Sequence, residues 1–192
     1  MTRRNTPRIY FIGFGEAGQA IASGLRETGI ERLAAWDILF PEEAGTKLKQ
    51  AAESLGVRVA SSARDAVRET DVIISAVTAA SSVDAARSVT SDLIGNPYYL
   101  DINSVSPGRK QETAGLLGER ARYVDVAVIA AIYPARHRTP LLLSGPHAES
   151  ISPLLHEMDM QFSVIGPEVG SAAAIKMIRS VMIKGMEALT LE

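Results

Sequence analysis

The chain contains no cysteine, which excludes disulfide bonds, thiolate zinc sites and cysteine nucleophiles. No apolar run approaches the roughly 18 residues that a membrane-spanning helix requires. Neither sign of charge dominates, because 20 basic and 22 acidic residues leave a formal net charge of −2 at pH 7. A strongly basic face for nucleic acid is therefore not expected. These absences predict a cytoplasmic protein that has neither a membrane nor a nucleic acid as partner.

The residues that are present predict an α/β fold. Hydrophobic residues make up 46% of the 192 positions and charged residues 22%, which is a globular composition. Short apolar runs alternate with amphipathic stretches, the pattern of a mostly parallel sheet covered by helices. Strands are predicted at 8–12, 33–37, 56–60, 71–77, 98–101, 123–128, 141–143 and 162–165. Helices are predicted from residue 19, and at 42–54, 63–69, 81–93, 107–118, 147–158 and 170–192.

The first strand ends in the glycine pattern Gly13-x-Gly15-x-x-Gly18, and a helical pattern follows at once. In a dinucleotide-binding turn the first glycine permits the bend, the second lets the backbone approach a pyrophosphate, and the third allows close helix packing. The helix N-terminus offers amide groups and a positive dipole end to the phosphates. The pattern predicts a Rossmann-type, doubly wound fold whose cofactor-binding turn comprises Gly13, Phe14, Gly15, Glu16, Ala17 and Gly18.

Asp37 sets the predicted choice of cofactor. It ends the second strand, 24 residues after Gly13, where an acidic side chain binds the adenosine ribose hydroxyls and repels a 2′-phosphate. The next three residues, 38–40, supply no arginine for such a phosphate. The sequence favours NAD over NADP.

The last predicted helix differs from the others, because it is long and its apolar stripe has no partner. At 1.5 Å per residue it would be on the order of 35 Å long. The chain is expected to divide into a dinucleotide-binding domain at 1–168 and the start of a long interdomain helix at 169–192. A C-terminal helical domain absent from this chain, or a second subunit, is expected to cover the stripe, which consists of Ile175, Ile178, Met182, Met186 and Leu189.

Four segments together resemble the β-hydroxyacid dehydrogenases, the family of 6-phosphogluconate and 3-hydroxyisobutyrate dehydrogenases. The chain looks most like the phosphogluconate-dehydrogenase-like NAD-binding branch. The segments are the glycine pattern, residues 101–107 (Asp-Ile-Asn-Ser-Val-Ser-Pro), residues 124–128 with 142–145, and residues 170–176. The resemblance implies a homodimer formed through the C-terminal helical region.

The resemblance implies that Lys176 is the general base, which removes the substrate hydroxyl proton while hydride leaves for the nicotinamide. A free lysine has a pKa of about 10.4, so desolvation or a nearby cation such as Arg179 would have to lower the pKa. The alternative is a solvated lysine like Lys184.

The resemblance also implies that Asn103 and Ser104 contact the substrate and that Asn103, Val77 and Thr78 contact the cofactor. The alternative for the serines is that Ser104 or Ser106 caps the helix that starts near residue 107.

Two departures from the family pattern concern the substrate. Residues 129–131 are Ile-Ala-Ala where hydroxyacid members have Ser-Gly-Gly, and Ser180 replaces an asparagine as the substrate-binding residue four positions after the lysine. The basic segment 133–138 is either a binding element for an acidic substrate or a solvated loop. The three histidines, His137, His147 and His156, lack metal-ligand spacing and are expected at surface or capping positions.

The sequence therefore predicts an NAD-dependent oxidoreductase that acts on a hydroxy acid or related alcohol, with an acidic small molecule as substrate and no metal. Two alternatives stay open: a dinucleotide-binding or sensor domain without catalysis, and an imine reductase-like enzyme.

Overall fold

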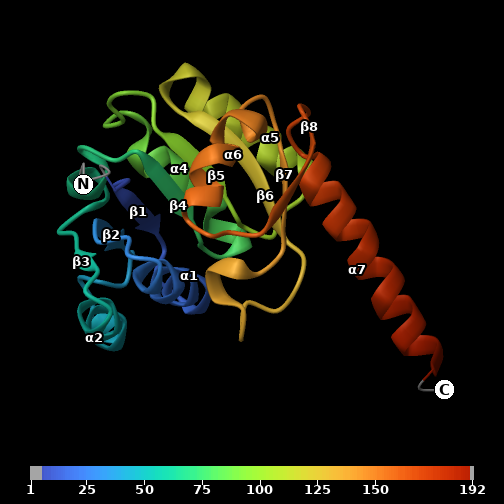
Figure 1. Ribbon diagram of the computed structural model, residues 1–192, viewed down its shortest axis with the longest axis horizontal. Helices are drawn as coiled ribbons and strands as arrows, with labels where there is room; N and C mark the ends of the chain where they lie inside the picture. Colours follow the sequence, from blue (N-terminus) through green and yellow to red (C-terminus); the bar gives the residue numbers. More distant parts are fainter. Residues whose placement is uncertain (1–5, 191–192) are drawn as a thin grey trace.

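The computed structural model describes residues 6–190, and its centre is an eight-stranded sheet (Figure 1). The strand order is β3-β2-β1-β4-β5-β6-β7-β8. All neighbouring strands are parallel except β6 and β7, which are antiparallel. The strands are β1 (Ile9–Ile12), β2 (Leu33–Trp36), β3 (Arg58–Val59), β4 (Val72–Ser75), β5 (Tyr98–Asp101), β6 (Arg122–Val128), β7 (Leu141–Ser144) and β8 (Phe162–Gly166).

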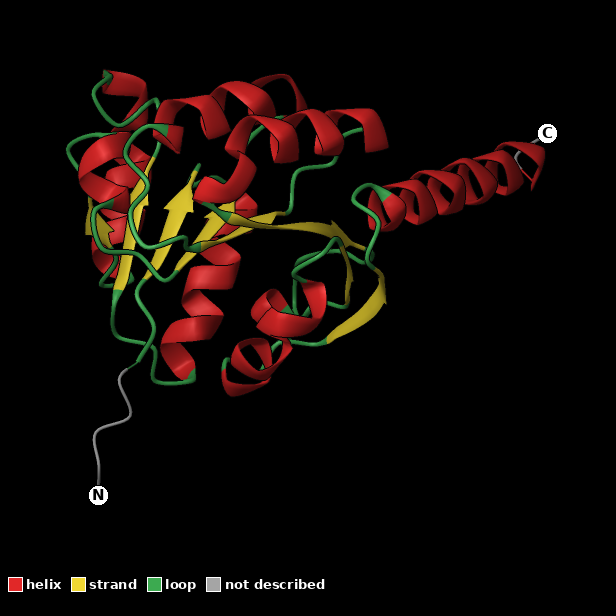
Figure 2. Cartoon of the chain, turned by 90° about the horizontal axis from the view of Figure 1, so that it is seen from above, coloured by secondary structure: helices red, strands yellow, loops and turns green. Residues whose placement is uncertain are grey.

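Helices cover both faces of this sheet, as Figure 2 shows. The helices are α1 (Glu16–Glu27), α2 (Thr46–Ser54), α3 (Ala63–Val67), α4 (Ser82–Thr90), α5 (Pro107–Leu117), α6 (Ala148–Glu157) and α7 (Ser171–Thr190). Along β1, Ile9 and Phe11 enter a core with residues of α1, α2 and α6, whereas Tyr10 and Ile12 enter a second core with residues of α3, α4 and α5. Successive side chains of a strand point to opposite faces of the sheet, and here both faces are buried under helices. The central strands are therefore continuous apolar runs in the sequence. The predicted doubly wound α/β fold is confirmed.

The predicted elements agree with the structure apart from their ends. The strand predicted at 56–60 is reduced to β3, and the helix predicted at 42–54 begins with a 3₁₀ turn at Glu43–Gly45 before α2. Helix α5 begins at Pro107, as predicted, and its cap is Ser106, whose Oγ accepts the Arg109 amide at 3.4 Å. Ser104 is therefore not the capping residue.

The loop between β6 and β7 lies against α1, which corrects one prediction. Most of the basic segment is exposed, although Arg136 pairs with Glu27 of α1 and donates to Ser23 Oγ at 3.1 Å. His137 is not a surface residue, because it is only 4% exposed and packs where Gly24 leaves room on α1. The prediction failed because burial of His137 depends on this long-range docking and not on its local sequence.

Helix α7 extends away from the body of the molecule (Figures 1 and 2). Its first turn is anchored, since Ala172 and Ala173 are buried, but the predicted stripe is open to solvent along its whole length. Met177, Val181 and Ile183 are exposed as well, so the uncovered apolar surface is broader than one stripe. Within residues 6–190 we find no helix with both the length and the apolarity needed to cross a bilayer.

Candidate dinucleotide and proton-transfer site

The three glycines of the first turn meet three different requirements. Gly13 has φ +82°, and a Cβ there would lie 2.4 Å from the Ala76 carbonyl oxygen. A Cβ on Gly18 would lie 2.9 Å from the Gly13 carbonyl oxygen, so α1 could not pack as closely. A Cβ on Gly15 would contact nothing within 4 Å. The space at Gly15 is therefore open to a ligand, whereas the other two positions are crowded by the protein itself.

The N-terminus of α1 has the donors that a pyrophosphate requires. In the described part of the chain, no acceptor pairs with the backbone N–H groups of Gly15, Glu16, Ala17 or Gly18, and no side chain caps this end. Unpaired amides and the positive end of the helix dipole favour an anion at this position. The turn therefore fits a dinucleotide phosphate. Phe14 differs, because its side chain is in the core and its amide is already bound.

Asp37 binds the Phe14 amide and thereby fixes the glycine turn to the end of β2. Its Oδ2 accepts from the Phe14 N–H at 2.8 Å, and its Oδ1 accepts from the Leu39 N–H at 3.0 Å. The carboxylate stands at the carboxyl end of β2 beside α1, where the fold family holds a ribose. Its remaining lone pairs are available to hydroxyl donors.

Asn103 joins the ends of β4 and β5 and is 4% exposed. Its side-chain oxygen accepts from the Val77 N–H at 2.7 Å, and its amide nitrogen donates to Ser75 Oγ at 3.0 Å. The Asn103 side chain therefore fixes the turn at Val77 through two internal bonds. Thr78 lies one residue further on and is exposed, with its hydroxyl 3.0 Å from that of Ser81.

A hollow of about 320 Å³ at the carboxyl ends of these strands brings several predicted residues together. Open α/β sheets bind their ligands at this edge, where the strand order reverses between β1 and β4. The hollow contains Ala17, Val77, Asn103, Ser104 and Lys176 together with the apolar residues Ala76, Ala79, Ile102, Val128, Ala130 and Ile132. It joins the glycine turn to α7.

Lys176 lies across this hollow from the end of β5 and donates a hydrogen bond from Nζ to Ser104 Oγ at 2.6 Å. Partial burial lowers the pKa of Lys176, and the positive charge of Lys110 lowers it further. The sequence named Arg179 as the candidate cation, but the Arg179 guanidinium donates to the Ile129 carbonyl at 3.0 Å. A lysine with a lowered pKa beside a hydroxyl is better suited to accept a proton than a solvated lysine.

Ser180 lines a second hollow of about 260 Å³, which shares Lys176, Val128 and Ala130 with the first. Arg179 also faces it. Apart from Lys176, Arg179 and Ser180 the walls are apolar, so this hollow suits a small molecule with an anionic group and a hydrocarbon part.

The sequence reasoning missed a buried ion cluster below the site, in which Lys110 lies between Asp101 and Asp125. Two aspartates could have indicated this cluster, because Asp125 interrupts the otherwise apolar strand at 123–128 and Asp101 ends the strand at 98–101. Lys110 itself gave no signal, because one lysine in an amphipathic helix is normally a surface residue.

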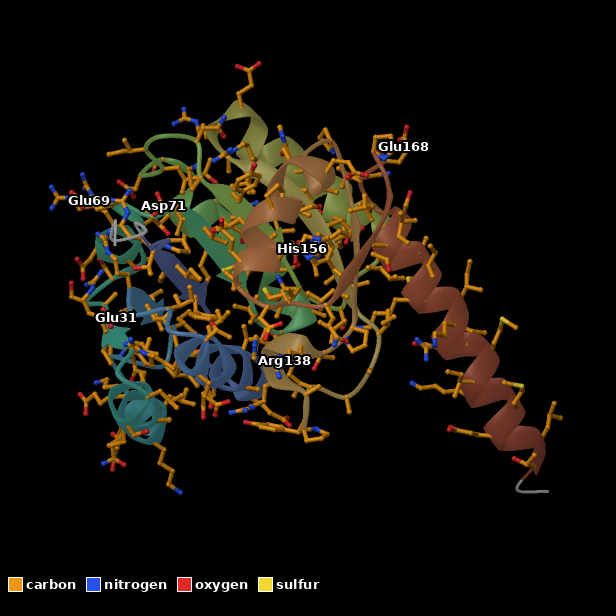
Figure 3. The ribbon with its side chains drawn as sticks, viewed as in Figure 1. Glu31, Glu69, Asp71, Arg138, His156 and Glu168 are labelled. Carbon is orange, nitrogen blue, oxygen red and sulfur yellow. The ribbon has the colours of Figure 1, made fainter. Side chains whose placement is uncertain are left out.

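The largest hollow, about 690 Å³, lies at the opposite end of β1 and β2. Figure 3 labels Glu31 and Glu69, which line it, and Asp71 nearby, all far from α7. We place the candidate site at the smaller hollow because the glycine turn and Lys176 meet there. No cluster of histidine, aspartate and glutamate able to hold a metal ion occurs in residues 6–190.

The glycine turn, the carboxylate at the end of β2 and the sheet order are those of a pyridine-nucleotide-binding domain of the oxidoreductase type. The chain belongs to the family described as NADP oxidoreductase, coenzyme F420-dependent, which matches residues 8–104. A relative from Methanothermus fervidus, an uncharacterized 28.5 kDa protein in the 7S RNA 5′ region, is 31% identical over 185 residues, which are 96% of this chain and 68% of that protein.

Solved structures agree with this assignment. A conserved hypothetical protein from Sinorhizobium meliloti 1021 is 36% identical with a TM-score of 0.88, over 96% of this chain and 62% of that one. A conserved protein of unknown function, described as structurally similar to 3-hydroxyacid dehydrogenases, is 32% identical with a TM-score of 0.82, over 95% of this chain and 66% of that one. An imine reductase variant from Myxococcus stipitatus, in complex with NAD⁺, is 26% identical with a TM-score of 0.81, over 96% of this chain and 63% of that one. The chain spans about two thirds of the length of these proteins.

Proposed function

We propose that the chain is the cofactor-binding part of an NAD-dependent oxidoreductase that acts on the carbinol group of a small molecule, with Lys176 as the proton acceptor. The observation that carries the proposal is the hollow in which Lys176 and Ser104 meet the glycine turn. The nicotinamide cofactor, when bound, supplies the acceptor for hydride. A cytoplasmic location stays a prediction.

In this mechanism the chain holds the phosphates on the amides of α1 and directs the substrate hydroxyl toward Lys176. Burial and the charge of Lys110 favour the neutral amine, which can take the hydroxyl proton. Ser104 holds Nζ in place through its 2.6 Å contact. Asn103 supports the cofactor side by holding the Val77 amide.

The test is steady-state turnover of a panel of β-hydroxy acids and alcohols with NAD⁺. Replacing Lys176 with alanine should lower kcat by about 10²–10⁴-fold, the usual contribution of a positioned proton acceptor. The matched control is Lys184→Ala, which removes an exposed lysine from the same helix and should leave kcat unchanged. The same loss of kcat in both variants, or no loss in either variant, would contradict the proposed role of Lys176.

We propose NAD as the preferred cofactor because of Asp37. A carboxylate beside the ribose repels a 2′-phosphate, so NADH should bind at least about tenfold more tightly than NADPH. Asp37→Asn keeps an oxygen that can accept from Phe14 N–H but removes the charge, and should narrow this ratio. Glu43→Gln removes a nearby exposed carboxylate and should leave it unchanged. NADPH binding more tightly than NADH to the wild type would reverse the assignment.

A second candidate is the reduction of an imine to an amine. It is favoured by the likeness to the Myxococcus stipitatus imine reductase and by the apolar walls at Val128, Ala130 and Ile132. Oxidation of NADH in the presence of cyclic imines, with no turnover of hydroxy acids, would select this candidate. Tight binding of NADH with no turnover of either class would leave a dinucleotide-binding module without catalysis.

We further propose that the chain forms a homodimer through the region that begins with α7. The proposal is supported by the apolar side chains that α7 exposes.

A further inference from the structure

A buried group of three charges lies between the sheet and α5, below the hollow that holds Lys176. The Lys110 side chain is 1% exposed, and those of Asp101 and Asp125 are fully buried. Lys110 Nζ lies 3.2 Å from Asp101 Oδ1 and 3.3 Å from Asp125 Oδ1. Buried charges are rare unless they are paired, so this lysine requires an explanation.

Lys110 connects two neighbouring strands. Its Nζ donates to the Asp101 carbonyl of β5 at 2.5 Å and to the Val126 carbonyl of β6 at 3.4 Å. Together with the two ion pairs, these bonds draw the ends of β5 and β6 to one point. One half of the site is the turn that follows β5, and the other is on α7, which is hydrogen-bonded to Asp125 of β6.

Asp125 is hydrogen-bonded to the start of α7. Asp125 Oδ2 accepts from the backbone N–H groups of Gly170 at 3.1 Å and Ala173 at 3.2 Å, and from Ser144 Oγ at 2.9 Å. Ser144 Oγ in turn accepts from the Ala172 N–H at 3.0 Å. These bonds satisfy the first amides of α7, which carries Lys176 one turn further on.

The Asp101 half leads to the turn at residues 102–104. Asp101 Oδ1 accepts from the Asn103 N–H at 3.0 Å, and Asp101 Oδ2 accepts from the Tyr123 hydroxyl at 2.8 Å. The same turn presents Ser104 to Lys176. Each carboxylate thus orients one side of the Lys176–Ser104 contact, and Lys110 is the group common to both.

We propose that Lys110 is a positioning residue: it holds the first turn of α7 against the turn at 102–104, and thereby sets the place and surroundings of Lys176. This inference rests on the proposed function, because it assigns Lys110 a part in that chemistry.

The charges around Lys176 give the inference a measurable consequence. Lys110 on α5 lowers the pKa of Lys176, while Ser104 and Asn103 face it from the end of β5, and Arg179 is the nearest cation on its own helix. With the Lys110 charge removed, Asp101 and Asp125 would stand below Lys176 without a counter-ion. Both changes favour the protonated form of Lys176.

The test measures the titration of Lys176 directly and requires no substrate. Trace acetylation with acetic anhydride across a pH series, followed by peptide mass spectrometry, gives the midpoint at which the Lys176 amine becomes reactive. The comparison uses wild type, Lys110→Cys, and the same variant after alkylation with 2-bromoethylamine in denaturant and refolding. Because the natural chain has no cysteine, that reagent restores an amine at this one thiol.

We expect the midpoint of Lys176 to rise in Lys110→Cys, so that its acetylation at pH 8 falls by at least about threefold, and to return toward wild type after aminoethylation. Lys184 on the same helix, read in the same digests, should not change. An unchanged midpoint in a folded Lys110→Cys protein overturns the proposal.

Ser144→Ala is the second variant, in case the cysteine variant does not fold. It removes a bond to the α7 amides without changing any charge, so the Lys176 midpoint should move in the same direction by a smaller amount. No movement in this variant also counts against the proposal. Loss of the proposed function is distinguishable: Lys176→Ala with full turnover would remove Lys176 from catalysis, while the titration result for Lys110 would stand.

Discussion

At the residue scale, two glycines of the first turn should differ in their roles: Gly13 is required for folding, whereas Gly15 is required for ligand binding. Gly15→Ala should leave the free energy of unfolding within about 1 kcal/mol of wild type, because its backbone is at φ −72° and a Cβ there contacts nothing. It should weaken NADH binding by at least about tenfold, because the methyl group would occupy the space that a pyrophosphate needs. Thermal denaturation and a fluorescence titration measure the two effects.

Gly13→Ala is the matched comparison and, unlike Gly15→Ala, should lower the free energy of unfolding. Its Cβ would lie 2.4 Å from a backbone oxygen at a positive φ, so we expect a loss of about 2 kcal/mol or more. A Gly15 variant that binds NADH as tightly as wild type would show that the dinucleotide does not lie on this turn.

His137 should make the stability of the protein depend on pH in the weakly acidic range. Burial lowers the pKa of His137 below its ordinary value, and both ring nitrogens lack a hydrogen-bond partner in the described structure. Since the folded pKa is the lower one, the unfolded chain binds more protons between the two values. Stability is therefore retained above about pH 6.5 and falls as the pH is lowered through that value.

The measurement is the melting temperature of wild type and His137→Leu between pH 7.5 and 5.5. The wild type should lose on the order of a few degrees more than the variant over this interval. His147, whose pKa is also lowered by burial, is present in both proteins and does not affect the difference. Parallel pH curves for the two proteins would mean that His137 charges freely in the folded state.

Residue types and spacing could predict those site residues whose signal is local. The glycines and Asp37 carry such a signal, whereas Lys176 was predicted from the family resemblance; the hollow brings Lys176 to Asn103 and Ser104, as that resemblance implied. Lys110 could not be found in this way, because its importance depends on two carboxylates that come from other strands.

At the element scale, the docking of the 3₁₀ turn Arg136–Arg138 on α1 should control the stability of α1. Gly24→Ala would ordinarily strengthen a helix by up to about 1 kcal/mol. Here its Cβ would lie 1.9 Å from Nδ1 of the buried His137, so we expect a net loss of about 1–3 kcal/mol.

Gly185→Ala is the control for helix propensity. It lies inside α7 with nothing within 4 Å of the added Cβ, so it should stabilise the protein or leave it unchanged. Urea denaturation of the two variants gives both values. If Gly24→Ala is as stable as Gly185→Ala, then the turn does not lie on α1 in solution.

Element positions were predictable because local and global preferences agree in most of this chain. The Ser106-Pro107 start of α5 and the apolar run of β4 are such cases. The path of residues 129–140 was not, since their place is set by contacts with α1, more than 100 residues earlier in the chain. The end of β3 was also missed, because a two-residue edge strand carries little pattern.

At the scale of the whole molecule, the sheet order follows from the usual rules of right-handed parallel crossovers, whereas the one antiparallel pair does not. The reversal at β7 places β8 beside β7 and the start of α7 against β6, and so brings Lys176 to the carboxyl end of the sheet. That step depends on Asp125, whose bonds to α7 no local pattern indicates. The global arrangement of the site was therefore supplied by the family resemblance.

The exposed apolar surface of α7 should make the chain associate with itself. Val181 is 71% exposed, Met182 61% and Met186 58%, a level of exposure that normally marks a surface covered by a partner. Size-exclusion chromatography with light scattering should show a mass above that of one chain, rising with concentration. The double variant Met182→Lys with Met186→Lys should shift the protein toward the mass of one chain and leave NADH binding unchanged, because both residues lie beyond the hollow that holds Lys176. Gln50→Lys, on the exposed side of α2, adds charge elsewhere and should not change the mass. A wild type that has the mass of one chain at every concentration would mean that α7 needs some other cover than a second copy of this chain.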